Sequence, residues 1–204
     1  MSESFDDIDN VQFDVLKEIG NIGAGNATTA LSQIINQRVD MEVPVVNLLE
    51  LKELPDIVGG AENILTGILF RLHGELDGMI MFVMERESSR HLLNILFQAN
   101  NDVNEEFSEM DRSALMEIGN MIVGAYLSSL SSLTNLLVTT SVPSIAIDMA
   151  GAILSVPAIE FGKLGDCALL IQSRFRENDI EVDGYFILIP TMESYGKIMK
   201  SLGM

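Results

Sequence analysis

The sequence predicts an α+β domain in which two copies of one unit, a helix, a strand, a hairpin and a second helix, surround an antiparallel sheet with pseudo-twofold symmetry. The main observation is an internal repeat: residues 16–31 (LKEIGNIGAGNATTAL) resemble residues 115–130 (LMEIGNMIVGAYLSSL) at a constant offset of 99. Shorter apolar runs bounded by Gly and Pro follow each of these helical segments and indicate strands. With 204 residues and 48% hydrophobic content, the chain can bury a sizeable core.

The first copy is expected to begin with one long amphipathic helix and to continue through a strand, a short turn, a hairpin and a closing helix. Apolar residues at helical spacing predict the helices, and short apolar runs next to Gly and Pro predict the strands. These elements are expected at residues 10–36, after Pro44, at 54–60, at 64–84 and at 88–98.

The second copy is expected to follow a similar order after a polar, acidic connector (ANNDVNEEFSE). It adds an apolar segment after its strand, and we expect this segment to be helical because apolar residues occupy nearly all of its positions. The helix, strand, apolar helix, hairpin and closing helix of this copy are expected at about residues 109–134, 137–142, 144–162, 167–190 and 192–202.

The repeat extends beyond the long helices. Pro44 recurs as Pro143 at the same offset of 99, and residues 76–88 (LDGMIMFVMERES) resemble residues 182–194 (VDGYFILIPTMES) at an offset of 106. The second copy therefore gains seven residues in its hairpin. Registers that persist over this length indicate a duplication of the whole unit.

The two copies are expected to fold together. A unit of about 90 residues with only three strands would leave the edges of its sheet open if it folded alone. We therefore expect residues 1–204 to form a single domain made of two intertwined repeats, at about 10–98 and 109–203.

One face of the first long helix carries polar residues. At 100° per residue, Glu18, Asn21 and Gly25 all lie within about 40° of Asp14, whereas the apolar side chains occupy the opposite arc. We therefore expect these four residues to form an outward stripe.

The second long helix repeats this stripe with Ser113, Glu117, Asn120 and Gly124. A lone outward Glu and Asn would most simply be a solvated surface, but the repeat preserves both residues while several core positions differ. A glycine on an exposed stripe leaves room for the backbone of another molecule. The duplicated stripe therefore predicts a binding surface.

The remaining small and polar residues of these helices are expected to be structural. Gly20, Gly23 and Gly119 fall on the core side, where they would allow close packing. Asn26 has no counterpart, since Ala125 stands at its position, and we expect Asn26 to hydrogen-bond a neighbouring backbone group.

Charge and composition exclude several classes of partner. Thirty acidic and twelve basic residues give a net charge of −18, which repels nucleic-acid backbones and anionic lipid surfaces. No apolar run is long enough to span a membrane and the first residues do not resemble a secretion signal, so a cytoplasmic location is expected. One cysteine and two histidines predict no metal site in the chain itself.

The stripe residues carry a resemblance to a known family. An Asp or Ser, three residues, a Glu, two residues, an Asn, twenty-two residues and a Pro form a pattern similar to the active-site signature of the CheC, CheX and FliY phosphatases of bacterial and archaeal chemotaxis. The resemblance covers essentially the whole chain, and two intact copies at this length are typical of the CheC members. The pattern occurs as Asp14, Glu18, Asn21 and Pro44, and as Ser113, Glu117, Asn120 and Pro143.

The resemblance implies an enzyme that dephosphorylates the response regulator CheY. Asn21 and Asn120 would orient the attacking water, and Glu18 and Glu117 would pair with the invariant lysine of the receiver domain. The Mg²⁺ would come with the receiver, so the resemblance implies no cofactor of the chain's own. The other stripe positions would contact the partner: Asp14, Gly25, Ser113 and Gly124.

The family also suggests a second partner and an alternative function. Its CheC members bind the receptor deamidase CheD, which raises their activity, so a non-catalytic adaptor that acts mainly through CheD is the alternative. The string GNIGAGN (20–26) contains a glycine pattern found in phosphate-binding loops. Nucleotide binding is nevertheless disfavoured, because no Lys-Ser/Thr pair follows and the second copy loses two of the small residues.

Overall fold

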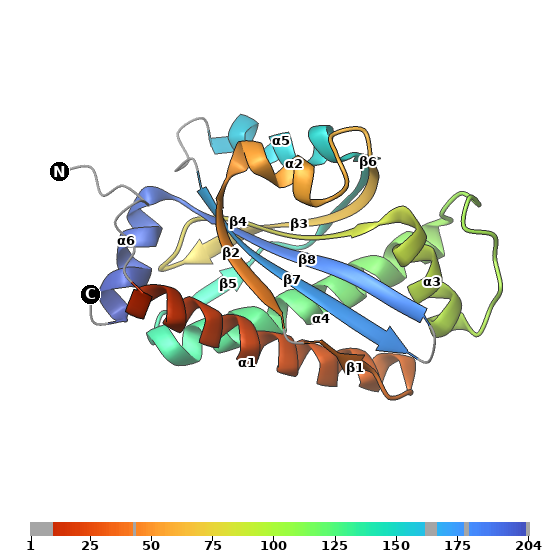
Figure 1. Ribbon diagram of the computed structural model, residues 1–204, viewed down its shortest axis with the longest axis horizontal. Helices are drawn as coiled ribbons and strands as arrows, with labels where there is room; N and C mark the ends of the chain where they lie inside the picture. Colours follow the sequence, from red (N-terminus) through yellow and green to blue (C-terminus); the bar gives the residue numbers. More distant parts are fainter. Residues whose placement is uncertain (1–9, 43, 162–166, 178–179, 203–204) are drawn as a thin grey trace.

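The computed structural model describes residues 10–42, 44–161, 167–177 and 180–202 (Figure 1). Its first half begins with a helix of 26 residues and ends with one of 12. The elements in chain order are α1 (Asn10–Ile35), β1 (Asp40–Met41), β2 (Val45–Glu50), a 3₁₀ turn (Leu51–Glu53), α2 (Leu54–Ile57), β3 (Ile64–Gly74), β4 (Gly78–Glu85) and α3 (Arg86–Phe97).

The second half again begins with a helix of 26 residues, and its described residues also form four strands and two further helices. Its elements in chain order are α4 (Glu109–Thr134), β5 (Val138–Thr140), β6 (Ser144–Met149), α5 (Ala150–Phe161), β7 (Cys167–Glu177), β8 (Ile180–Pro190) and α6 (Met192–Ser201). The expected long helices, both hairpins and both closing helices are therefore confirmed, with ends that differ by one or two residues.

One antiparallel sheet joins the two halves of the chain. Its strand order is β1-β7-β8-β4-β3-β5, with β2 also paired to β7 and β6 also paired to β3. Each half therefore supplies an outer strand to the hairpin of the other half, and β4 pairs with β8 between the two hairpins. The chain has an α+β fold, as the sequence predicts.

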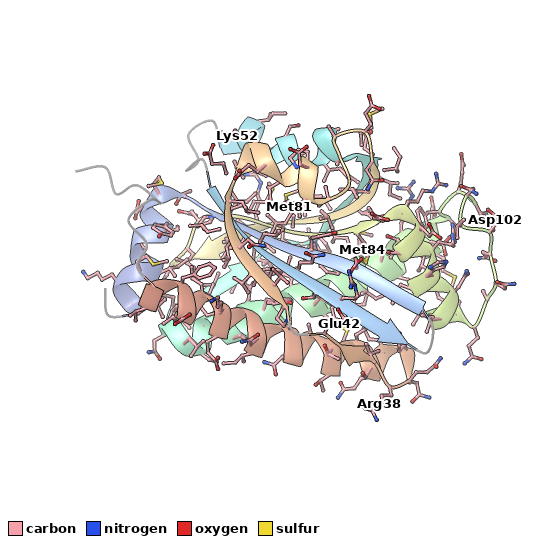
Figure 2. All side chains as sticks on the ribbon, in the orientation of Figure 1. Arg38, Glu42, Lys52, Met81, Met84 and Asp102 are labelled. Carbon is pink, nitrogen blue, oxygen red and sulfur yellow. The ribbon has the colours of Figure 1, made fainter. Side chains whose placement is uncertain are left out.

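Helices cover both faces of this sheet (Figure 1). Alternate residues of each central strand enter opposite clusters, so that Met84 packs in the larger cluster beneath α1 and α4, and Met81 packs in the smaller one beneath α2 and α5 (Figure 2). A sheet buried on both faces needs apolar residues at consecutive positions, which explains the run MIMFVM in β4.

Both long helices end in the same way. The residue after α1, Asn36, and the C-cap of α4, Asn135, have φ angles of 51° and 57°. Asparagine tolerates this left-handed conformation better than most residues with a side chain. The same local turn therefore follows both helices, at positions 99 residues apart.

The core-side glycines allow α1 and α4 to pack closely on the sheet. A Cβ at Gly20 would lie 2.7 Å from Val46 Cγ2, and one at Gly119 would lie 2.6 Å from Ile68 Cδ1. A Cβ at Gly23 would overlap the ring of Tyr126 on α4. The prediction that these three glycines serve close packing is confirmed.

One expected helix is wrong in its first part. Residues 144–149 form β6, and only residues 150–161 form a helix. The segment follows Pro143 as β2 follows Pro44, and it pairs with β3 from Ile64↔Met149 to Leu69↔Ser144. Pairing with β3 makes residues 144–149 a strand. The sequence did not predict this, because an apolar run alone does not distinguish a buried strand from a buried helix.

Smaller differences concern single residues and short segments. The expected turn at 54–60 begins with a short helix, α2, and β5 is the strand expected at 137–142. Each half contains one strand more than expected, β1 in the first half and β6 in the second. Ile22 is 37% exposed although its angle places it on the core side. Asn26 donates a hydrogen bond from Nδ2 to Oγ of Ser129 on α4, at 3.3 Å, so its partner is a side chain and not the backbone.

Candidate functional site

The outward stripe of α1 lies on the exposed face of the helix. Asp14, Glu18, Asn21 and Gly25 are all exposed, while Leu16, Ile19 and Leu31 of the opposite arc are buried. A carboxylate and a carboxamide one turn apart therefore project from the protein surface with a bare glycine beyond them.

The outward stripe of α4 has the same arrangement. Ser113, Glu117, Asn120 and Gly124 are all exposed. Since α1 and α4 lie side by side on the same face of the sheet, the protein carries two copies of the Glu and Asn pair on one layer (Figure 1).

The stripe glycines differ from the core-side glycines in their surroundings. A Cβ at Gly25 or at Gly124 would meet no atom within 4 Å. The packing of the fold therefore does not require a glycine at either position. Because glycine weakens a helix by about 1 kcal/mol relative to alanine, these residues need another explanation.

A cleft of about 340 Å³ lies beside Asn21. It is lined by Lys17 and Asn21 of α1 and by Pro44, Val45 and Val46 at the start of β2. The motif proline thus lies next to the motif asparagine, although the two are separated by twenty-two residues in the sequence. A side chain at this position of α1 can contact a group that is bound against the start of β2.

The motif spacing follows from the length of the helix. From Asn21, α1 continues for fourteen residues to Ile35, a rise of about 21 Å. The nine residues 36–44 can span about 30 Å when extended, which is enough to bring the chain back to the level of Asn21. From Asn120, α4 likewise continues for fourteen residues to Thr134.

The first stripe contains an ion pair. Lys17 Nζ lies 3.4 Å from Asp14 Oδ1 and 4.6 Å from the centre of the Phe13 ring. The two charged side chains are 48% and 74% exposed. Sequence reasoning did not single out Lys17, and only its place in the cleft beside Asn21 draws attention to it.

The start of α4 is held by a buried arginine. Arg90 of α3 is fully buried, and it donates to Asp111 Oδ2 at 3.2 Å and to the carbonyl oxygen of Glu105 at 2.9 Å. Burial of Asp111 opposes its ionisation, but hydrogen bonds from Ser108 and Arg90 outweigh this effect and lower the pKa of its carboxyl group. This contact fixes the helical turn that precedes Ser113.

Tyr126 anchors the contact between the two long helices. Its ring packs against Gly23 and stacks on Phe186, with 4.2 Å between the ring centres. Its hydroxyl lies 2.7 Å from Oγ of Ser173 on β7. Burial raises the pKa of Tyr126 to about 12, so its hydroxyl stays neutral. The contacts of its ring link α4 to α1 and to the sheet.

The described residues contain neither a metal-binding cluster nor a membrane-spanning helix. No three His, Cys, Asp or Glu side chains among them come close enough together to bind a metal ion. None of the helices in the described ranges is long and apolar enough to cross a membrane.

Known proteins resemble this chain along almost its whole length. The model of the CheC-like family matches residues 11–48, and that of the chemotaxis phosphatase CheX matches residues 65–158. The CheY-P phosphatase CheC of Bacillus subtilis (strain 168) is 35% identical over 204 residues, which cover 98% of this chain and 97% of that protein.

Solved structures share the fold. FliY of Thermotoga maritima superposes with a TM-score of 0.73 at 19% identity, over 96% of this chain and 99% of that one. The CheX–CheY–BeF3–Mg²⁺ complex of Borrelia burgdorferi contains a chain that matches with a TM-score of 0.52 at 18% identity, over 84% of this chain and 96% of that one.

Proposed function

The chain belongs to the CheC family, and from this premise we propose that it is a chemotaxis phosphatase that removes the phosphoryl group from phosphorylated CheY. The observation that carries the proposal is the pair of exposed stripes, in which Glu18 with Asn21 and Glu117 with Asn120 occupy equivalent turns of two adjacent helices.

In the proposed mechanism, each asparagine orients the attacking water. A carboxamide both donates and accepts hydrogen bonds, so Asn21 or Asn120 can hold a water in line with the aspartyl phosphate. Among the described residues, no side chain makes a hydrogen bond to the carboxamide of Asn21 or Asn120. As the oxygen of the water bonds to phosphorus, the bond from phosphorus to the aspartate oxygen breaks, releasing inorganic phosphate and restoring the receiver carboxylate.

The glutamates are proposed to orient the receiver. Glu18 and Glu117 each lie one turn before their asparagine and have no ionic partner among the described residues. A carboxylate in this position can pair with the invariant lysine of a receiver domain. Positioning of this kind suits phosphoryl transfer, in which alignment and charge stabilisation supply most of the catalysis.

The Mg²⁺ of this reaction is proposed to enter with the substrate. The receiver carboxylates would bind the ion, and the chain would add no ligand of its own. The remaining stripe positions, Asp14, Gly25, Ser113 and Gly124, would contact the receiver surface, and the open space at both glycines supports this role. Since the phosphorylated receiver is a cytoplasmic protein, we place the enzyme in the cytoplasm.

We further propose that the two halves are intertwined repeats related by a pseudo-twofold axis. The limits of α1 and α4, and of β2 and β6, differ by 99 residues at both ends. In the β4–β8 pair, Met81 lies opposite Ile187, which is its own counterpart at the offset of 106. A residue that faces its own counterpart is what a twofold axis through this pair requires.

A role for CheD rests on family membership alone. We propose CheD as a second partner, and a non-catalytic adaptor acting through CheD stays as the alternative function. The two asparagines distinguish these functions, since an adaptor has no need of a water-orienting carboxamide at either stripe.

The proposal is tested by replacing both asparagines. We expect the double variant Asn21→Ala, Asn120→Ala to lose accelerated phosphate release from phosphorylated CheY while it still binds the receiver. The readouts are phosphate release over time and binding to a receiver bearing beryllofluoride. Since both side chains are exposed, the melting temperature should not change. An unchanged rate of phosphate release would leave the adaptor as the better description.

A further inference from the structure

We propose that Lys17 is an additional catalytic residue that serves the first site only. In this proposal, which rests on the proposed function, its ammonium group contacts the phosphoryl oxygens of the bound receiver and stabilises the charge that develops on them. The second site has Met116 at the equivalent position. The two sites would then use the same Glu and Asn pair with different electrostatic support.

Lys17 lies in the right place for this contact. It lines the same cleft as Asn21 and Pro44. On α1 it precedes Asn21 by four residues, which places the two side chains on one face about 6 Å apart along the helix axis. A water held by the carboxamide and a phosphoryl group facing that water would both be within reach of a long, flexible lysine side chain.

The ion pair with Asp14 holds Lys17 only loosely. Exposed pairs of this kind contribute little to stability, because water solvates both charges well. The pair is long, at 3.4 Å, and both side chains are largely exposed. The Phe13 ring supports the ammonium at 4.6 Å from its centre. Lys17 can therefore move from Asp14 to a phosphoryl group at little cost in free energy.

The second long helix carries no cation at the position equivalent to Lys17. Asp14 and Lys17 are together replaced by the neutral residues Ser113 and Met116, so each stripe, counted with the residue at position 17 or 116, has the same net charge. The nearest basic residue in sequence before Asn120 is Arg112, which lies eight residues earlier, about 12 Å along the helix axis. The exchange of an ion pair for two neutral residues therefore distinguishes the sites chemically.

The chemistry of phosphoryl transfer gives such a cation a function. As the water attacks and the bond to the aspartate oxygen breaks, negative charge gathers on the three oxygens that stay with phosphorus. The Mg²⁺ that would enter with the receiver would neutralise part of this charge, and a further ammonium would add to its effect. Lys17 remains protonated throughout and transfers no proton. The phosphate carries away the proton left by the attacking water.

The test uses backgrounds in which one site works alone. In Asn120→Ala, where only the first site is intact, Lys17→Met is expected to lower kcat for phosphate release about five-fold, and Lys17→Arg to retain most of it. In Asn21→Ala, where only the second site is intact, Met116→Lys is expected to raise kcat. The first-site rate should also become less sensitive to salt in Lys17→Met, because a charged contact has been removed.

A charge-matched control separates a local effect from a change in overall charge. Lys52 lies on the opposite side of the sheet from α1, next to α2 (Figure 2). Lys52→Met in the Asn120→Ala background should leave kcat unchanged. Melting temperatures should be alike for all these variants, since both lysines are exposed.

The outcomes separate this proposal from the proposed function. If the double asparagine variant retains its activity, the phosphatase mechanism fails, whatever Lys17 does. If that variant is inactive but Lys17→Met leaves kcat unchanged, or raises only KM, the role of Lys17 is overturned and the mechanism stands. An equal loss in Lys52→Met would also overturn it.

Discussion

Two glycines on opposite faces of α1, Gly20 and Gly25, serve different purposes. Gly20 faces the sheet, where a side chain would press against Val46, whereas Gly25 faces solvent, where a side chain would touch nothing. The same contrast recurs in α4 with Gly119 and Gly124. The position of a glycine on the helix therefore decides whether it serves the fold or the surface.

Replacing these glycines by alanine should have opposite effects on stability. Gly25→Ala is expected to raise the free energy of unfolding by about 1 kcal/mol, because alanine favours the helix. It should nevertheless raise KM for the phosphorylated receiver in the Asn120→Ala background, because the methyl group occupies space left for the partner.

Gly20→Ala is the matched comparison. It should lower the free energy of unfolding by about 1–3 kcal/mol, because the new methyl group overpacks the contact with Val46. Urea unfolding and receiver titrations measure both variants. A Gly25→Ala variant with unaltered KM would argue against a partner contact at this position.

At the scale of the element, the start of α4 depends on a contact from α3. Arg90 lies buried between the two helices with its guanidinium 4.4 Å from the centre of the Phe107 ring, and it donates to Asp111 in the first turn of α4. Ser108 caps the same turn and exchanges hydrogen bonds with Asp111. The second stripe begins two residues later, so this contact sets the direction in which α4 presents it.

Removing the buried arginine should destabilise the protein and change its response to acid. Arg90→Met is expected to lower the free energy of unfolding by about 3 kcal/mol, because Asp111 loses its ionic partner. Arg112→Met, which removes a half-buried guanidinium from the same turn, should have a much smaller effect.

The pH dependence follows from the lowered pKa of Asp111. Because the folded pKa lies below the ordinary value of 3.8, the contribution of this group to stability is complete above that value. It is lost as the pH falls through the folded pKa. Arg90→Met should therefore show a shallower loss of stability in acid, measured by urea unfolding between about pH 2 and 5. Parallel acid limbs for the variant and the parent would contradict this assignment.

At the scale of the whole molecule, strands from the two halves pair with each other. All six residues of β2 pair with β7, and all six of β6 pair with β3. Together with the pairing of β4 with β8 and the packing of α1 on α4, these contacts bury residues of both halves in one hydrophobic core. Neither half has its complete sheet without the other.

The halves should therefore not fold separately. Residues 1–101 and 102–204, divided in the exposed connector at Asp102 (Figure 2), are expected to lack cooperative thermal unfolding when each is studied alone. Mixing them should restore it, as measured by circular dichroism and gel filtration. The full chain cut at this point after folding is the control and should stay associated. Cooperative unfolding of either fragment alone would contradict the intertwined arrangement.

The sequence by itself determined the features that depend on local periodicity and on the repeat. The limits of α1 and α4, both hairpins and the outward stripe with Glu18 and Asn21 could all be predicted, because helical spacing and turn residues specify them directly. The family could also be predicted, because its motif is a spacing of residues.

Only the tertiary structure decided the features that depend on a distant partner. Residues 144–149 form a strand because β3 lies alongside them, and β2 finds its place beside β7, more than a hundred residues away. The cleft that joins Lys17 to Asn21 and Pro44 forms where the returning chain meets the helix. Pairing and packing between distant segments leave no periodic signal in the sequence, which is why these features became visible only in three dimensions.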